Sequence, residues 1–302
     1  MIALVTGGYG FIGNQIAQLI AAEYAEVRIL DNLSNTARPV RLPNVRLIKS
    51  DIRDTDATNE AFADVDVVFH TAARIDVVAS TRDPFVDMDN NVKGTLSVCE
   101  AARRHDISKL VYSSSAAVYG NADFFPINES SPIRPLSPYA VSKYCGELYM
   151  AAYHNLYGLS TLSLRYFNVY GPYQRPENEY SGVISKFFFN AVRNAPLEIH
   201  GDGNQTRDFV YVTDVAKANL LAAKSDADAV VNIGSGRETS INDLAAIIKE
   251  IALSDSKVAH GAPRISDGRR SLADISSAKR IINYEPAINI TEGLRKLKQF
   301  FL

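Results

Sequence analysis

Short runs of β-branched and other apolar residues alternate with longer amphipathic segments through the first half of the chain, and this alternation constrains the fold most strongly. The apolar runs are typical of strands that are buried on both faces, and the amphipathic segments are typical of helices. Strands are predicted at 2–7, 26–31, 45–51, 65–72, 109–115 and 159–169, and helices at 13–24, 90–105 and 137–158. Buried strands separated by helices predict an α/β fold with a doubly wound parallel sheet.

The second half of the chain is less regular and predicts a smaller C-terminal α/β unit. A segment at 171–182 that is rich in proline, glycine and polar residues predicts a loop leading into this unit. Helices are predicted at 183–194, 240–251 and 291–302, and a strand followed by a helix at 207–224. We expect one domain over 1–167, to which 208–235 returns, and a second domain formed by 168–207 and 236–302.

Composition and charge exclude several classes of function. The net charge of −2 gives no electrostatic basis for binding nucleic acid or an anionic membrane. No apolar run is long enough to predict a membrane span, and the five histidines have no metal-ligand spacing, so no metal is expected. Two cysteines and the lack of a secretory signal pattern favour the reducing cytoplasm.

A glycine-rich turn follows the first predicted strand. The sequence VTGGYGFIG places Gly7, Gly10 and Gly13 between that strand and the first helix. Glycines here allow a tight turn, a close approach of the backbone to a pyrophosphate, and close helix–strand packing, while the helix N-terminus favours negative charge. The turn therefore predicts a dinucleotide site, and 1–167 is the expected dinucleotide-binding domain.

Acidic residues follow the second and third predicted strands. Asp31 comes 18 residues after Gly13, where a carboxylate accepts both ribose hydroxyls and repels a 2′-phosphate. No arginine stands beside it, so NAD is favoured over NADP. Asp51 and Ile52 are candidates for holding the adenine through one carboxylate and one backbone group.

Tyr139 and Lys143 are four residues apart in the predicted helix 137–158, so they share one helix face. A lysine ammonium about 4 Å from a phenolate, at an effective dielectric constant near 20, stabilises it by roughly 4 kcal/mol. This is enough to lower a phenol pKa by about three. We therefore predict a strongly lowered pKa for Tyr139 and a role as the catalytic base.

These motifs, together with SSSAAVYG, RYFNVYGP, GDGNQTRDFVYVTDVA and ADISSAKR, cover nearly the whole chain. The sequence resembles the extended short-chain dehydrogenase/reductase family, and within it the nucleotide-sugar 4-epimerases of the UDP-glucose (UDP-galactose) 4-epimerase kind. The resemblance implies a Rossmann fold, bound NAD, a UDP-sugar substrate, and a catalytic Ser115 beside Tyr139 and Lys143. It also implies a homodimer formed through the helices at 90–105 and 137–158.

The resemblance places further contacts in both halves of the site. Besides Gly7, Gly10, Gly13, Asp31, Asp51, Ile52, Tyr139 and Lys143, it implies that NAD contacts Phe11, Ile12, Asn32, Ser34, Asn35, Ala72, Ala73, Asn91, Ser113, Tyr166 and Phe167. Besides Ser115, it implies that the UDP-sugar contacts Asn168, Val183, the strand Glu198–His200, Arg207, Arg264 and Asp267. Two positions depart from the family pattern, since Ile75 replaces a common lysine and Ser266 a common glycine.

The expected reaction removes the proton of the sugar 4-hydroxyl, passes through a 4-keto sugar and returns the hydride to the opposite face. Related dehydratases and decarboxylases have acidic residues where this chain has Ala116 and Ala117, which argues against their reactions. Ser271 leaves room for an N-acetyl group where some epimerases have a tyrosine. The alternatives are a UDP-glucuronate 4-epimerase, for which Arg175 is the candidate cation, and a non-catalytic NAD-sensing module.

Overall fold

The computed structural model describes residues 1–37, 39–174, 182–263 and 268–301. A seven-stranded sheet lies at its centre, with the strand order β11-β6-β5-β4-β1-β2-β3. All neighbouring strands pair in parallel, which confirms the predicted doubly wound α/β fold. The strands are β1 (Ile2–Thr6), β2 (Glu26–Asp31), β3 (Val45–Lys49), β4 (Val67–His70), β5 (Lys109–Ser115), β6 (Thr161–Tyr166) and β11 (Ala229–Ile233).

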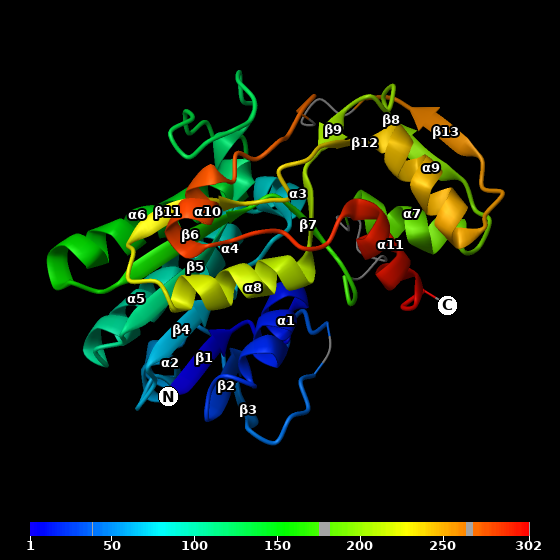
Figure 1. Cartoon of the computed structure of the whole chain (residues 1–302). Helices are drawn as coiled ribbons and strands as arrows, with labels where there is room; N and C mark the ends of the chain where they lie inside the picture. Colours follow the sequence, from blue (N-terminus) through cyan, green and yellow to red (C-terminus); the bar gives the residue numbers. More distant parts are fainter. Residues whose placement is uncertain (38, 175–181, 264–267, 302) are drawn as a thin grey trace.

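Helices cover both faces of this sheet (Figure 1). Side chains alternate along each strand, so Ala3 and Val5 pack in one apolar cluster while Leu4 packs in another. The first cluster includes side chains from α1 (Phe11–Ile20), α8 (Val212–Ala223) and α10 (Ser276–Ile282). The second includes side chains from α2 (Thr55–Ala61), α5 (Gly94–Arg104) and α6 (Pro138–Tyr157). Because helices cover both faces, the central strands β1 and β4 are buried along nearly their whole length, whereas the edge strand β3 is partly exposed.

The connection from β4 to α5 contains two short helices that were not predicted and a π-helical turn in which the predicted helix 90–105 begins. These are α3 (Val77–Arg82), α4 (Pro84–Met88) and a π-helical turn over Asp89–Lys93 that leads into α5. Asp76 and Asp83 cap α3 and α4 through their carboxylates, which accept backbone N–H groups. Helices of five or six residues carry too little apolar periodicity to be recognised, whereas their caps are visible in the sequence.

A smaller lobe continues from the carboxyl end of β6 (Figure 1). The predicted strand 159–169 is divided at Phe167 into β6 and β7 (Asn168–Tyr170), and β7 pairs with β10 (Phe209–Tyr211). The buried side chains of Phe188, Leu244 and Leu294 join the helices of this lobe. Its other elements are α7 (Val183–Ala191), β8 (Leu197–His200), β9 (Thr206–Arg207), β12 (Thr239–Ser240), α9 (Ile241–Ala252), β13 (Val258–Gly261) and α11 (Ile290–Lys298).

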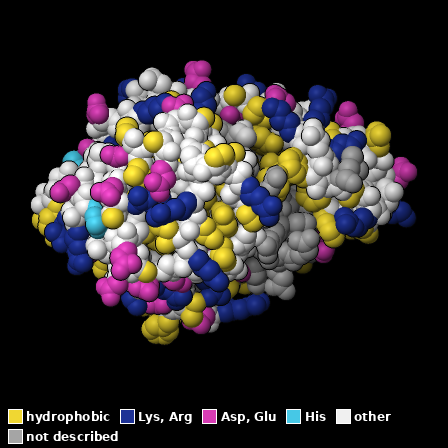
Figure 2. Space-filling model, turned by 90° about the horizontal axis from the view of Figure 1, so that it is seen from below, with side chains coloured by type: hydrophobic (Ala, Val, Ile, Leu, Met, Phe, Trp, Pro, Cys, Tyr) yellow, Lys and Arg dark blue, Asp and Glu magenta, His cyan; other side chains and the backbone are white. Residues whose placement is uncertain are grey.

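The chain reverses its direction of travel across the sheet between β1 and β4, which are adjacent. In a doubly wound sheet, ligands bind beyond the carboxyl ends of the strands at this position. In the described part of the chain, no helix has both the length and the apolar composition to cross a bilayer. On the face shown in Figure 2, charged side chains of both signs are interspersed, as expected from the net charge of −2.

Candidate active site

The glycine turn after β1 is closely packed against the loop that follows β4. Gly7 has a φ of +67°, and a Cβ there would lie 2.7 Å from the Ala72 Cα atom. A Cβ on Gly13 would lie 2.3 Å from the Gly7 carbonyl oxygen. Gly10 caps α1 and provides no side-chain hydrogen bond, so the first N–H groups of the helix are left for a ligand. This backbone cradle fits the pyrophosphate of a dinucleotide.

Asp31 ends β2 beside the glycine turn and is buried. Its carboxylate accepts hydrogen bonds from the backbone N–H groups of Tyr9, at 2.9 Å, and Leu33, at 2.7 Å. These two bonds hold the carboxylate at the edge of the cradle, where a ribose hydroxyl of a dinucleotide is expected. Asn32, which follows it, is exposed and donates to Asp51 Oδ2 at 2.8 Å.

The Asp51 carboxylate is engaged by Arg53, a residue that the sequence analysis did not single out. The guanidinium donates to Asp51 Oδ1 and Oδ2, both at 2.9 Å, and it also donates to Asp89 at 2.8 Å. This pairing holds the pKa of Asp51 well below its usual range. With Asn32 and the Arg53 N–H also donating, both carboxylate oxygens already accept two hydrogen bonds. A contact between Asp51 and adenine therefore stays a prediction.

The three predicted catalytic residues come together where β5 meets α6. Ser115 ends β5, and Tyr139 and Lys143 lie in the first two turns of α6, whose N-cap is Ser137. The Ser115 hydroxyl and the Tyr139 phenol are hydrogen-bonded. Lys143 is 4% exposed, and its Nζ donates to the Ser113 carbonyl oxygen at 2.8 Å. A hydroxyl, a phenol and an ammonium are thus gathered at the carboxyl end of a central strand.

The prediction that Lys143 strongly lowers the pKa of Tyr139 is wrong for the chain by itself. Burial, together with the negative charge of Asp87, raises the pKa of Tyr139 to about 12, although the hydrogen bond from Ser115 lowers it. Burial also lowers the pKa of Lys143 to about 8. The physical reason is that the predicted charge stabilisation ignored the cost of removing both groups from water.

Asn91 lies in the π-helical turn and is a hub of buried hydrogen bonds. Its Oδ1 accepts the Arg74 N–H at 2.7 Å. Its Nδ2 lies 2.9 Å from the Arg74 carbonyl oxygen, 3.0 Å from Asp87 Oδ1 and 3.1 Å from Ser142 Oγ. This arrangement supports the loop after β4, and a contact between Asn91 and NAD stays a prediction. Asp87 and Ser142 were not predicted as part of the site: Asp87 belongs to the unpredicted α4, and Ser142 lies in α6.

The remaining predicted cofactor residues lie around the same strand ends. Ser113 Oγ and the Tyr166 hydroxyl are 3.0 Å apart, and Asn219 Nδ2 donates to that hydroxyl at 2.7 Å. Phe167 is buried in an apolar cluster with Tyr119. Phe11 and Ile12 lie in the first turn of α1, and Ala72 and Ala73 lie in the loop that follows β4. Ile52 is buried, whereas Ser34 and Asn35 are exposed. Ile75, the departure from the family pattern, is 59% exposed.

A buried histidine links the end of β1 to α5. His70 Nδ1 lies 2.7 Å from Thr6 Oγ1, and its Nε2 lies 3.0 Å from Thr95 Oγ1. Thr95 donates to the Asn91 carbonyl oxygen at 2.6 Å. Burial, with a smaller contribution from the charge of Lys143, lowers the pKa of His70 to about 3. The imidazole is therefore neutral at physiological pH and acts as a polar connector.

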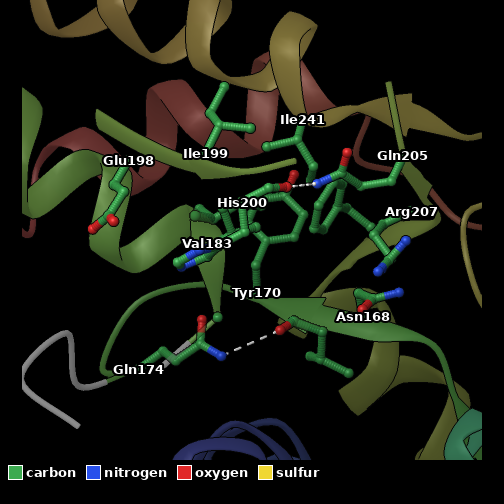
Figure 3. Close-up of a pocket in the computed structure, with 14 residues that line it drawn as sticks. Asn168, Tyr170, Gln174, Val183, Glu198, Ile199, His200, Gln205, Arg207 and Ile241 are labelled. Atoms are coloured by element: carbon green, nitrogen blue, oxygen red, sulfur yellow. Dashed lines mark hydrogen bonds between the residues drawn. The ribbon is translucent and has the colours of Figure 1, made fainter. Parts of the chain in front are cut away.

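A cavity of about 260 Å³ lies in the smaller lobe between β7, β8 and the start of α7. Of the predicted substrate residues, it brings together Asn168, Val183, His200 and Arg207 (Figure 3). The sequence analysis missed Gln205, whose amide donates to the His200 carbonyl oxygen at 2.7 Å. Arg264, Asp267, Ser266 and Arg175 lie outside the described residues.

Ser271 lies in the strand-like segment that joins the two halves of the site. Its neighbour Arg270 forms an ion pair with Glu238 at 2.7 Å and lies 4.9 Å from the centre of the Phe125 ring. On its other side, the Leu272 carbonyl oxygen accepts the Ile127 N–H at 2.8 Å. The Ser271 side chain itself is half-buried.

The glycine cradle, the acidic end of β2 and the Ser–Tyr–Lys group are features of a dinucleotide-dependent enzyme, and a phenol in such a group can serve in acid–base chemistry. The model of the NAD dependent epimerase/dehydratase family matches residues 3–234, and the chain belongs to this family. Among the described residues, no group of three or more histidine, cysteine or acidic side chains is placed to hold a metal ion.

Three known proteins illustrate the similarity. A UDP-glucose 4-epimerase from Mycolicibacterium smegmatis is 37% identical over 310 residues, which cover 100% of this chain and 98% of that protein. The UDP-N-acetylglucosamine 4-epimerase from Methanobrevibacter ruminantium, solved with UDP-N-acetylmuramic acid, superposes with a TM-score of 0.95 at 39% identity and covers 99% of this chain and 97% of its own. The UDP-glucose 4-epimerase from Thermus thermophilus, solved with NAD, has a TM-score of 0.92 at 35% identity, and the match covers 100% of this chain and 99% of that chain.

Proposed function

We propose that the chain is an NAD-dependent 4-epimerase of a UDP-sugar, with UDP-glucose and UDP-galactose as substrates. The observation that carries the proposal is the meeting of Ser115, Tyr139 and Lys143 at the carboxyl end of β5, on the same edge of the parallel sheet as the glycine cradle after β1. The short 3₁₀ helix that follows, Ala116–Tyr119, begins with two alanines and brings no further acid to this point. The names of the similar proteins support the same reaction.

The cofactor half of the proposal rests on the fit of the strand ends to NAD. The N-terminus of α1 and the turn with Gly7, Gly10 and Gly13 would hold the pyrophosphate, and Asp31 would accept the ribose hydroxyls. Further contacts are assigned to Phe11, Ile12, Asn32, Ser34, Asn35, Asp51, Ile52, Ala72, Ala73, Asn91, Ser113, Tyr139, Lys143, Tyr166 and Phe167. When bound, NAD would supply the hydride acceptor for oxidation at C4 of the sugar and the hydride donor for the re-reduction, and its oxidised ring would add positive charge near Tyr139.

The chain's own residues carry the proton. As the phenolate, Tyr139 accepts the proton of the sugar 4-hydroxyl while the hydride leaves C4 and a 4-keto sugar forms. The same group, now a neutral phenol, returns the proton after the sugar has turned over. Ser115 orients the 4-hydroxyl through its hydrogen bond to Tyr139. Lys143 lies four residues after Tyr139 on the same face of α6, and the Ser113 carbonyl oxygen holds its ammonium in place. The reaction shows no net change in oxidation state.

The cavity of the smaller lobe is assigned to the nucleotide. Its wall combines apolar side chains with the amide of Asn168, the imidazole of His200 and the guanidinium of Arg207, which suits a flat base and a diphosphate. In Figure 3 the side chains of Asn168 and Arg207 point into the same space. Val183 completes the contact with the base, and Arg264 and Asp267 are assigned to a phosphate and a ribose hydroxyl.

Incubation of the purified protein with UDP-glucose, followed by chromatographic separation of the nucleotide sugars, tests the proposal. We expect UDP-galactose to appear until equilibrium is reached, with no accumulation of free NADH. If only UDP-glucuronate is converted, the substrate is a uronate. NAD binding without conversion of any UDP-sugar would contradict the proposal and identify a sensing module.

A second substrate class is favoured by the residue at 271. Serine is small, and one similar protein is a UDP-N-acetylglucosamine 4-epimerase. We propose that an N-acetyl group at C2 of the sugar is accommodated beside Ser271. The replacement Ser271→Tyr is expected to abolish conversion of UDP-N-acetylglucosamine and to preserve conversion of UDP-glucose. An equal effect on both substrates would contradict this assignment.

We also propose a cytoplasmic homodimer. Support for the dimer comes from exposed apolar side chains on α6, one of the two helices expected at the interface, and on the adjacent α3 and α4; α5, the other expected helix, exposes no large apolar side chain among its residues, all of which are described. The exposed residues are Val77, Val78, Phe85, Met88, Val141 and Leu148. The replacement Phe85→Glu is expected to convert a dimer of about twice the 33.1 kDa chain mass into a monomer in light scattering. A wild-type monomer at micromolar concentration would contradict the dimer. The free cysteines Cys99 and Cys145 are consistent with a reducing compartment.

A further inference from the structure

A buried ion pair lies directly behind the catalytic residues. Arg165 Nη2 lies 2.6 Å from Glu147 Oε2, and Arg165 Nε donates to Glu147 Oε1 at 2.9 Å. The side chains are 5% and 3% exposed. Arg165 comes from β6 and Glu147 from α6, so this two-pronged contact fixes the helix against the sheet.

The ion pair contacts the strand that carries the catalytic serine. Glu147 lies four residues after Lys143 on α6, so the two side chains share one face of the helix. Glu147 Oε1 also accepts the hydroxyl of Ser114. Ser114 lies between two residues that contact the catalytic group. The carbonyl oxygen of Ser113 accepts a hydrogen bond from Lys143 Nζ, and the hydroxyl of Ser115 is hydrogen-bonded to the Tyr139 phenol. The carboxylate therefore joins β5 to α6 at the level of the catalytic group.

The network continues from Arg165 toward the substrate side. Arg165 Nη1 donates to the Tyr119 hydroxyl at 2.8 Å, and that hydroxyl donates to Asn232 Oδ1 at 2.7 Å. Asn232 Nδ2 in turn donates to the Ile127 carbonyl oxygen at 2.9 Å. Residue 127 pairs with Ala273, two residues beyond Ser271. One continuous set of hydrogen bonds thus runs from the catalytic strand to the segment beside the proposed sugar site.

Packing alone does not require charges at this place. Removing two ions from water is costly, and replacing a buried ion pair by apolar residues of similar volume is often neutral or stabilising. What apolar residues do not provide is a set of directed hydrogen bonds to Ser114 and Tyr119. We infer that Glu147 and Arg165 are positioning residues, which hold Ser115 and Lys143 at the distances that proton transfer needs. The inference rests on the proposed epimerase function.

The double replacement Glu147→Met with Arg165→Met tests this role, because it removes both charges and leaves neither one buried alone. For the NAD-loaded enzyme we expect a melting temperature within a few degrees of the wild type, a KM for UDP-glucose within threefold, and a kcat reduced about 100-fold. A misplacement of about 1 Å in an active site has an effect of this size. A kcat within threefold of the wild type would overturn the inference.

Lys109→Met is the matched control, since Lys109 is also buried and lies at the opposite end of β5. Its Nζ donates to Ser160 Oγ at 2.9 Å and to the Ala227 carbonyl oxygen at 2.6 Å, away from the catalytic group. We expect this variant to melt at a lower temperature with kcat unchanged. A fall of kcat as large as in the double variant would show that any buried charge has this effect, and would overturn the inference.

Two further measurements keep the inference testable if the double variant folds poorly or if the wild type does not convert UDP-glucose. Glu147→Gln keeps an acceptor for Ser114, so we expect it to retain more kcat than Glu147→Met; equal loss would count against the role. A crystal structure of either Glu147 variant tests the geometry without substrate. We expect the Lys143 Nζ to Ser113 oxygen distance, 2.8 Å in the native chain, to exceed hydrogen-bonding range in Glu147→Met. An unchanged distance would overturn the inference, whatever reaction the enzyme performs.

Discussion

The replacement Gly13→Ala probes the cradle by steric means alone. Gly13 lies in α1, and the added Cβ would stand 2.3 Å from the Gly7 carbonyl oxygen and 2.6 Å from Thr71 Oγ1. Real Cβ atoms keep roughly 3 Å from such neighbours, so the turn must move by about 0.7 Å in a close-packed region. Overpacking of this kind costs about 1–3 kcal/mol. A chain of 302 residues has an unfolding entropy of about 0.6 kcal/mol/K, so a loss of about 3 kcal/mol in the free energy of unfolding lowers the melting temperature by about 5 °C.

The displaced turn also moves the N–H groups that are assigned to the pyrophosphate, so we expect the NAD content and the epimerase rate to fall at least tenfold. Gly158→Ala separates this effect from a general loss of stability. Gly158 ends α6 at φ +72° with nothing within 4 Å of an added Cβ, so the change costs only backbone strain of about 1 kcal/mol. Melting curves and the NAD content of the two purified variants distinguish a loss of NAD binding from a general loss of stability. Gly13→Ala protein with full NAD content would refute the reasoning.

Three other predictions follow from buried polar groups. Because the folded pKa of His70 is lowered to about 3, its stabilising effect is complete above pH 6.5 and is lost as the pH falls toward 3. When the pH is lowered from 7 to 5, the free energy of unfolding in urea should fall by about 2 kcal/mol more for the wild type than for His70→Gln. Equal losses in the two proteins would contradict this prediction. Asp208→Asn should lower the stability by about 3 kcal/mol, because the Asp208 carboxylate accepts the N–H groups of Ser235, Gly236 and Ala273; an unchanged melting temperature would contradict it. Asp31→Ala should weaken NAD binding at least tenfold in calorimetry and reduce the preference of the protein for NAD over NADP. An unchanged affinity for NAD would argue against the role assigned to Asp31.

Six of the seven strands of the central sheet were predictable because most of them are rich in apolar residues and alternate with long amphipathic helices, whereas β11 was not predicted. Predicted bounds agreed with β2 and β5 and lay within a few residues for α6. The short helices α2, α3, α4 and α10 were missed, since seven residues or fewer give no clear period. The division of 159–169 into β6 and β7 depends on the Phe167 N–H donating to Ile233, a residue far away in the sequence.

The site was predictable where local sequence dictates geometry. The glycine turn, Asp31 and the Tyr139–Lys143 spacing all belong to single elements, and the resemblance added Ser115. The balance of charge and burial was not predictable, because Asp87 reaches the site from α4 and Glu147 contacts Arg165 across the sheet. The raised pKa of Tyr139 follows from this three-dimensional environment, which spacing along one helix does not describe.

Tyr139→Phe removes one oxygen atom and keeps the ring, so it tests the acid–base role with little effect on packing. The measurement is the rate of UDP-glucose to UDP-galactose conversion by the NAD-loaded variant, beside its affinity for UDP-glucose. General acid–base groups contribute about 10²- to 10⁴-fold. We predict a loss of about 10³-fold in rate with affinity retained; a rate within tenfold of the wild type would contradict the account.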